Sequence, residues 1–349
     1  MDRRAFLGAA ALVAAGAAAA GGGAALLGRS SGAAQVRESV RLPAAAEPAP
    51  PLPPGIDPGF VTANPDFYRV DTALTVPRVD LASWRLTIGG LVDSPVELSF
   101  ADLLDRPLVE RVVTLNCVSN EVGGPYISTA NFVGVALRDV LDEAGVQVGA
   151  DQLVGRSSDG WNCGTPTEVV LEPGRGALLA LAMNGEPLPA EHGFPVRVVV
   201  PGLYGYVSAT KWLVDLELTT FDAFTPYWAR RGWARRAPIK TMSLIDRPSG
   251  FQRVPAGRVA AAGIAWAQHK GVDAVEVKVD GGTWIEATLA SEVNLDTWRM
   301  WRAELDVAPG RHTVEVRATD KTGYTQTADR ADPIPDGATG WHSVVFVAV

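Results

Sequence analysis

The pattern of apolar and polar positions predicts a chain that is rich in strands. Residues 112–115 form an apolar run typical of a buried strand, and this run leads to Cys117 and a polar loop closed by Gly123 and Gly124. A strand end followed by a loop is where mixed folds commonly place their chemistry. Other apolar runs predict strands at 84–88, at both ends of 153–171, at 197–202 and at 209–218. Residues 175–185 form a short apolar segment that ends in a turn.

Two stretches at helical spacing predict helices and indicate an α+β fold class for the first part of the chain. Ser99 is expected to cap a short helix, with Asp102 at its third position. The stretch after Cys117, residues 127–146, is expected to carry a helix that ends at the C-cap Gly145. Its apolar positions are Val135, Leu137, Val140 and Leu141.

The last third of the chain has the pattern of a sandwich of short strands. Alternating valines from 275 to 279, a glycine turn and a second alternating run predict a hairpin. Further short runs follow at regular spacing, so residues 237–349 are expected to form an immunoglobulin-like β-sandwich. The cysteine–tryptophan–cysteine spacing of true immunoglobulin domains is absent from the sequence.

The first 59 residues differ in composition from the rest. Residues 1–34 contain Arg3 and Arg4 and then a long alanine- and glycine-rich run, the pattern of a twin-arginine export signal. A Sec signal and a retained membrane anchor are the alternatives, because the run is long enough to span a bilayer. Export would place the protein in the periplasm or on the outer face of the cytoplasmic membrane. Residues 35–59 predict a proline- and alanine-rich linker, which leaves 60–236 as the first folded domain.

Composition narrows the classes of partner. The 349 residues carry 31 Lys and Arg against 39 Asp and Glu, a formal net charge of −8. This balance argues against nucleic acid as a partner, because phosphate binding needs a basic surface. The two cysteines, Cys117 and Cys163, do not make a disulfide framework, although one bridge is possible on paper. Cys163 is expected to be a small, partly buried residue, whereas Cys117 is either a core residue or a soft metal ligand.

Residues 221–236 are dense in aromatic and basic side chains. One interpretation is a connector that packs Trp228 and Trp233 onto the first domain. The other is a rim or partner surface with arginines stacked over aromatic rings. We favour packing for the two tryptophans and leave the role of the arginines open.

Two segments together resemble one enzyme family. The first is TLNCVSN, a strand end with a C-x-x-N loop at Cys117. The second, MNGEPLPAEHGFPVRVVVPGLYGYVSATKWL, runs from Met183 to Leu213. Their order and spacing resemble the sulfite oxidase family of molybdopterin enzymes, and the resemblance covers roughly residues 60–349. It implies a mixed sheet-and-helix molybdopterin-binding domain followed by a β-sandwich that dimerises the enzyme.

The resemblance also implies a molybdenum–molybdopterin cofactor and the residues that hold it. Cys117 would be the thiolate ligand of molybdenum. The other implied cofactor-binding residues are Asn120, Asp159, His192, Arg197 and Lys211. Several of these residues also have a structural interpretation. Asp159 could form an Asx turn, and His192 could be a buried structural histidine. Arg197 and Lys211 could be ordinary surface charges beside a strand.

The reaction implied by this cofactor is two-electron oxygen-atom transfer. The sequence contains no C-x-x-C-H motif for covalent haem attachment. Electrons would therefore pass to or from an external carrier, a cytochrome or a quinone-linked protein. The alternative is a non-catalytic exported protein that uses the same scaffold for binding or assembly.

Three departures from the family pattern bear on the substrate. Glu121 follows the C-x-x-N motif where the family has arginine, and Leu181 stands where a family motif has tyrosine. FYRVDT replaces F-x-x-R-N-H, which leaves only Arg69 nearby. Arginines of that kind bind oxyanions, so sulfite is doubtful, and a neutral or bulkier substrate such as a sulfoxide or N-oxide is favoured.

Overall fold

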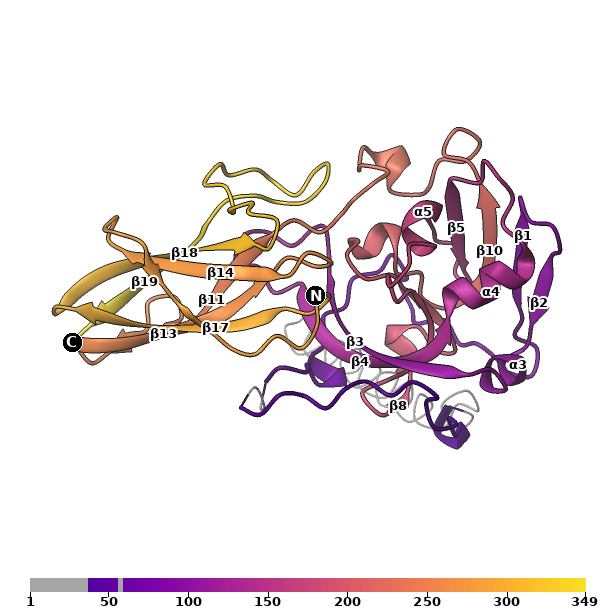
Figure 1. Ribbon diagram of the computed structural model, residues 1–349, viewed down its shortest axis with the longest axis horizontal. Coiled ribbons are helices and arrows are strands. Elements are labelled where there is room, and N and C mark those ends of the chain that lie inside the picture. Colours follow the sequence, from indigo (N-terminus) through magenta and orange to yellow (C-terminus); the bar gives the residue numbers. More distant parts are fainter. Residues whose placement is uncertain (1–36, 56–58) are drawn as a thin grey trace, which may run out of the picture.

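The computed structural model describes residues 37–55 and 59–349, which form two parts side by side along the long axis of the molecule (Figure 1). The expected export segment, residues 1–34, lies outside the described residues. Within the described ranges, no helix is both long and apolar enough to cross a membrane.

Two sheets build the first part. The strand that leads to Cys117, β3, is an edge strand that pairs along its whole length with β4. The other sheet has the order β2-β1-β10-β5-β6, with β1 and β10 parallel and the other neighbours antiparallel. The first sheet consists of β3 (Leu108–Asn116), β4 (Ile127–Ala136), β7 (Leu178–Met183), β8 (Glu186–Pro187) and β9 (Arg197–Val199). The second consists of β1 (Leu86–Gly90), β2 (Val96–Leu98), β5 (Gln152–Ser157), β6 (Asn162–Pro166) and β10 (Leu213–Thr219).

The stretch after Cys117 corrects one prediction. Its first half is a strand, β4, and only its second half is a helix, α4 (Leu137–Ala144). The expected C-cap is confirmed, since Gly145 has φ 71° and its N–H donates to the Leu141 carbonyl. Residues 127–136 are a strand because they pair with β3. The pair Asn116 and Ile127 closes this hairpin around the Cys117 loop.

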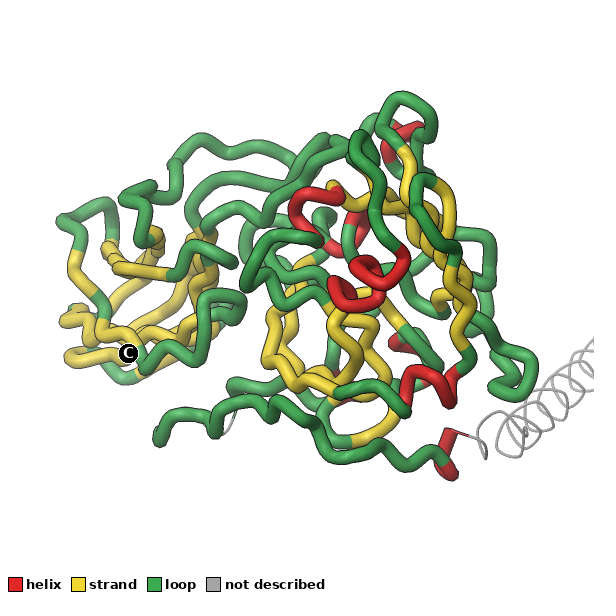
Figure 2. The backbone as a smooth tube through the Cα atoms, turned by 45° about the vertical axis from the view of Figure 1, so that its right-hand side comes forward, coloured by secondary structure: helices red, strands yellow, loops and turns green. Residues whose placement is uncertain are grey.

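Short helices connect some strands of the first part, and among the described residues strands are far more common than helices (Figure 2). The expected cap is confirmed at α3 (Phe100–Leu104), where the Asp102 N–H donates to the Ser99 hydroxyl and the Ser99 N–H donates to the Asp102 carboxylate. The α+β expectation therefore holds only in the coarser sense of a sheet-rich domain with few helices. The remaining helices are α5 (Thr167–Val170) and the 3₁₀ turns η1 (Asn64–Asp66), η2 (Ala190–His192), η3 (Gly205–Val207) and η4 (Ala229–Arg231).

The second part is a β-sandwich, as the alternation predicts. The hairpin is confirmed by β14 and β15, with Asp280 and Gly281 in the left-handed region at φ 50° and 71°. Its two sheets share one apolar core; an immunoglobulin-like topology stays a prediction. One sheet consists of β11 (Met242–Arg247), β13 (Gly257–Trp266), β17 (Arg299–Val307) and β16 (Thr288–Leu289). The other consists of β12 (Arg253–Val254), β19 (His342–Ala348), β18 (Gly310–Asp320), β14 (Val272–Val279) and β15 (Ile285–Glu286).

The free edge of β3 is covered from two sides. From the second part, the Asn294 side chain donates to the Val112 carbonyl (2.9 Å), and the Thr114 N–H donates to the Asp296 carbonyl (3.0 Å). From the described part of the proline-rich segment, the Glu47 carbonyl accepts from the Glu110 N–H at 2.8 Å. This stretch therefore lies along the first domain, where an extended spacer is expected. The hydrogen bonds from these two segments pair backbone groups that an edge strand otherwise leaves unpaired, and they fix the strand that leads to Cys117.

Candidate active site

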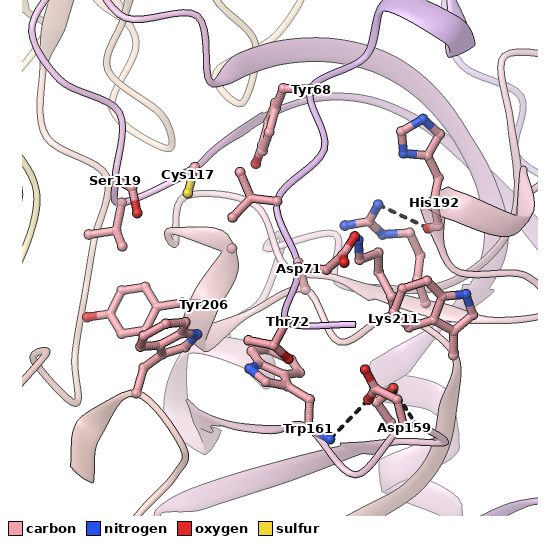
Figure 3. A pocket seen from close by; sticks show the side chains of 18 of the residues that line it. Tyr68, Asp71, Thr72, Cys117, Ser119, Asp159, Trp161, His192, Tyr206 and Lys211 are labelled. Carbon is pink, nitrogen blue, oxygen red and sulfur yellow. Dashed lines mark hydrogen bonds and ion pairs between the residues drawn. The ribbon is translucent and has the colours of Figure 1, made fainter. Parts of the chain in front are cut away.

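One cavity gathers most of the residues expected to carry chemistry (Figure 3). Its volume is about 130 Å³. A single buried water needs only roughly 10–15 Å³, so the cavity has room for a ligand and is more than a packing defect. Segments that lie far apart in the sequence line it: 67–72, 117–119, 157–161, 192–212 and 228–233.

Cys117 enters this cavity from the end of β3. Its N–H donates to the Tyr126 carbonyl at 3.0 Å, which holds the base of the loop, and burial raises the pKa of its thiol. The resemblance implies a cofactor role for Asn120, but the side chain of Asn120 does not line the cavity. Its amide oxygen accepts from the Tyr126 N–H at 2.9 Å. Asn120 thus shapes the loop that presents Cys117.

Figure 3 shows His192 on the side of the cavity away from Cys117, and Arg197 lies beside His192. Arg197 is 5% exposed, and one of its terminal nitrogens donates to the His192 carbonyl at 3.2 Å. Its Nε has no partner among the described residues, and burial lowers its pKa to about 10. The His192 ring donates from Nε2 to the Asn64 carbonyl at 3.0 Å, and burial lowers its pKa to about 4. At neutral pH His192 is therefore uncharged, and within residues 37–55 and 59–349 the buried Arg197 guanidinium has no carboxylate partner.

Lys211 reaches the same cavity but already has an anionic partner. Its Nζ lies 2.7 Å from a carboxylate oxygen of Asp71, which also accepts from Arg69 at 2.8 Å. Burial lowers the pKa of Lys211 to about 8. Gly193, with φ 115°, separates the two cation-bearing segments; a Cβ there would lie 3.1 Å from both Arg197 and Lys211. Glycine suits this position, because a side chain would be strained at this positive φ and its Cβ would press on the Arg197 Cβ and on Cα and Cβ of Lys211.

Asp159 fits both of its interpretations. Its carboxylate accepts from the Trp161 N–H at 3.0 Å, which is the hydrogen bond of an Asx turn. Asp159 and Trp161 also line the cavity, together with Ser157. The turn therefore brings a carboxylate and an indole ring to the floor of the site.

Several cavity residues were not anticipated from the sequence. Tyr68 lines the cavity beside Cys117 and stacks on Phe67, with ring centroids 5.5 Å apart. Burial and the neighbouring Cys117 thiol raise the pKa of its hydroxyl, so it is a protonated donor at neutral pH. The only sequence signal for Tyr68 is its place in FYRVDT, and the corresponding family motif, F-x-x-R-N-H, draws attention to its arginine and not to this position.

The connector also corrects an expectation. Trp228 and Trp233 do not only pack onto the first domain, because both line the cavity. Tyr206 joins them, and its hydroxyl donates to the Ala234 carbonyl at 2.6 Å. The signal for this arrangement was the aromatic density of 221–236, which we interpreted as packing.

Two residues chosen as informative departures lie away from the cavity. Leu181 is fully buried in β7 within the apolar core, and Glu121 is exposed on the outer side of its loop; neither lines the cavity. The inference that they alter the pocket directly is therefore wrong. Cys163 is buried, unbridged and 3.1 Å from the Thr210 hydroxyl, and burial raises its pKa to about 11.

This donor set fits an elongated ligand with a soft metal at one end and an anion at the other. The thiol of Cys117 suits a soft metal. The unpartnered Nε of Arg197 and the ammonium of Lys211 suit a phosphate, to which both would donate charge-assisted hydrogen bonds. A buried guanidinium without a counter-ion is costly, so an anionic ligand at this end would remove an existing penalty.

Sequence comparisons point to the same chemistry. The family described as "Oxidoreductase molybdopterin binding domain" matches residues 73–228. The chain is similar to sulfite oxidase of Gallus gallus, with 30% identity over 81% of this chain and 72% of that protein. It is also similar to mitochondrial sulfite oxidase of Macaca fascicularis, with 33% identity over 87% of this chain. That alignment covers 64% of the macaque protein, so the chain spans just under two thirds of its length.

A structural comparison gives the same fold. The structure is similar to that of the sulfane dehydrogenase SoxCD from Paracoccus pantotrophus, with a TM-score of 0.72 and 24% identity over 84% of each chain. At 24% identity this match supports the fold, and it covers most of both chains.

Proposed function

This protein belongs to the sulfite oxidase family of molybdopterin oxidoreductases, and we propose that it is an exported enzyme that transfers an oxygen atom with the exchange of two electrons. The observation that carries the proposal is the convergence of Cys117, His192, Arg197 and Lys211 on one cavity. Cys117 follows strand β3, whereas the other three residues come from the later segment 192–211, and the fold brings the two together.

Each residue has a definite task in this proposal. When bound, the molybdenum cofactor supplies the redox chemistry. Cys117 would hold the metal through its thiolate, and the charge of the metal would overcome the burial that otherwise keeps the thiol protonated. Arg197 and Lys211 would hold the phosphate. His192 would contribute a hydrogen-bonding edge without adding charge, because its imidazole is neutral.

The proposed reaction balances with an external electron carrier. An organic S-oxide or N-oxide, two electrons and two protons give the deoxygenated product and one water. We propose a cytochrome or a quinone-linked protein as the source of the electrons. Metal analysis of protein from a molybdopterin-producing host tests the cofactor assignment, with one molybdenum per chain expected. Folded protein without molybdenum would favour the non-catalytic alternative.

The charge of the cavity supports a neutral substrate, although for a different reason than the sequence suggested. Of the side chains that line it, Asp71 and Asp159 are acidic and Arg197 and Lys211 are basic, so the formal charges cancel (two against two). Both cations are also assigned to the phosphate of the cofactor. A compact dianion such as sulfite therefore finds no excess positive charge, whereas a neutral sulfoxide or N-oxide needs none.

We expect the molybdenum-loaded protein to reduce organic sulfoxides or N-oxides faster than it oxidises sulfite. A viologen-linked assay with methyl phenyl sulfoxide and trimethylamine N-oxide measures the first activity, and a ferricyanide-linked assay measures the second. An enzyme on its own substrate commonly reaches a kcat/KM of about 10⁴–10⁸ M⁻¹ s⁻¹. Sulfite oxidation in that range, with both oxides below it, would contradict the substrate proposal.

Export through the twin-arginine route is proposed from residues 1–34, because this route carries proteins that have already folded around a cofactor. We expect the double variant Arg3→Lys and Arg4→Lys to stay in the cytoplasm, while the wild type is recovered outside it. Cell fractionation with immunodetection measures this. Normal export of the double variant would indicate a Sec signal.

A further inference from the structure

Three aromatic side chains form a wall of the cavity that the cofactor assignment does not use. They are Tyr206, Trp228 and Trp233, here called the aromatic collar. The Tyr206 and Trp233 rings lie 5.7 Å apart at 52°, and the Trp228 and Trp233 rings lie 6.3 Å apart at 78°. Each residue is only half-buried, so ring surface remains open to the cavity. Figure 3 shows Tyr206 on the same side of the cavity as Cys117 and Ser119, away from His192 and Lys211.

The segment that carries the collar is held in place by hydrogen bonds to the body of the first domain. The buried Gln152 side chain donates to the Phe224 carbonyl at 3.0 Å, and the Tyr227 N–H donates to the Asn162 side chain at 3.0 Å. The Tyr206 hydroxyl donates to the Ala234 carbonyl at 2.6 Å and so bridges the two collar segments. A wall fixed at several points presents its rings without an ordering cost at binding.

The arginines next to the collar in the sequence do not line the cavity. Arg230 and Arg231 belong to the same segment, but neither lines the cavity. The Arg230 guanidinium lies over the Phe224 ring at 5.8 Å from the centroid, and the Arg231 guanidinium lies 3.6 Å from the Tyr227 centroid and 6.0 Å from that of Trp228. Both arginines are exposed. The surface that the collar presents to the cavity is therefore aromatic, and the arginines of its segment lie outside the cavity lining.

We propose that the aromatic collar binds the apolar body of the substrate and determines specificity. The substrate class is a neutral organic sulfoxide or N-oxide that carries an aryl or alkyl group, with the group against Trp228 and Trp233 and the oxide toward Cys117. This inference rests on the proposed function of the site. Apolar groups are discriminated in pockets of this kind because aromatic side chains bury large areas and contact planar groups favourably.

The first experiment compares two ligands that differ only in apolar size. Methyl phenyl sulfone and dimethyl sulfone, analogues one oxidation step above the sulfoxides, are titrated into molybdenum-loaded protein by calorimetry. We expect the phenyl compound to bind about tenfold or more tightly, by the usual range for added apolar groups in a pocket. Trp228→Ala and Trp233→Ala should bring the two affinities together, and Trp233→Phe should restore part of the difference.

Trp284→Ala provides the matched control, because Trp284 is a half-buried tryptophan that packs against Trp341 on the second part and does not line the cavity. This variant should keep the wild-type ratio of affinities. With the corresponding sulfoxides, the collar variants should raise KM for the phenyl substrate, while kcat per molybdenum changes little.

Two results of the sulfone titrations would overturn the role of the collar. One is equal affinity of the wild type for the two sulfones, and the other is an unchanged ratio in both alanine variants. Failure of the proposed function has a different signature, since protein without molybdenum is detected by metal analysis whatever the sulfones do. Preferred turnover of sulfite, with tight binding of the phenyl sulfone only as a competitor, would also overturn the assignment.

Discussion

We expect Cys117→Ser to abolish turnover while leaving the fold intact. A hydroxyl is a harder ligand than a thiol and loses its proton less readily, so it would not replace the thiolate on a soft metal. Even residues that only support a metal ligand commonly cost about 10–100-fold when changed, so loss of the ligand itself should exceed that range. The fold should survive because the loop is held by backbone groups and by Asn120, while the Cys117 side chain lies at the cavity surface.

Turnover per molybdenum, the visible absorption spectrum and the electron paramagnetic resonance of the metal measure the effect. Cys163→Ser is the matched control, because Cys163 is also buried and unbridged but lies outside the cavity beside Thr210. That variant should retain the spectrum of the wild type, with at most a lower unfolding temperature. If Cys117→Ser kept both the activity and the spectrum of the wild type, Cys117 would not be a metal ligand.

The sequence predicts strands well where local pattern and burial agree. Val112, Val113 and Leu115 give this run apolar side chains on both faces, and the run is buried in β3 between β4 and the contacts from the second part. The Ser99 cap and the Gly145 cap were predictable because each depends on residues within a few positions. In contrast, residues 127–136 became a strand because β3 lies beside them, and local spacing does not report a partner strand.

The site was predictable only where motif letters coincide with geometry. His192, Arg197 and Lys211 lie within the one motif segment from Met183 to Leu213, and all three line the same cavity. At Leu181 the motif and the geometry disagree. Its motif aligns by letters, but the alternation of β7 directs position 181 into the apolar core.

The collar could not be derived from local pattern at all. Trp228 and Trp233 lie in a segment with little regular structure, and what brings them to the cavity is a set of long-range hydrogen bonds from Gln152, Asn162 and Tyr206. Aromatic density in a connector indicates that the rings contact something. Whether that is a core or a cavity depends on residues more than twenty positions away in the chain.

The remaining large effect concerns retention of the cofactor, and we expect Arg197→Met to weaken it more than Lys211→Met. Each substitution removes a charge-assisted hydrogen bond to the phosphate, worth about 1.5–3 kcal/mol, or roughly 10–150-fold in affinity. Arg197 should lie at the upper end, because its guanidinium has an unpartnered Nε and can donate through two nitrogens. Lys211 should lie at the lower end, because Asp71 already neutralises it at 2.7 Å.

The stability of the cofactor-free protein separates this role from a structural one. The Arg197 guanidinium is buried without a carboxylate, and replacing such a charge by an apolar side chain of similar length is often neutral or stabilising. We therefore expect cofactor-free Arg197→Met, made in a host that lacks molybdopterin, to unfold at the temperature of the wild type or above it. A structural arginine would instead unfold at a lower temperature.

Pterin and molybdenum content of purified protein, measured beside thermal unfolding, tests both halves of this prediction. Arg258→Met is the control, because Arg258 is exposed on β13 of the second part and should change neither quantity. The order expected for cofactor content is wild type and Arg258→Met, then Lys211→Met, then Arg197→Met. Full cofactor content in Arg197→Met, together with a lower unfolding temperature, would mean that this arginine supports the fold and that the phosphate binds elsewhere.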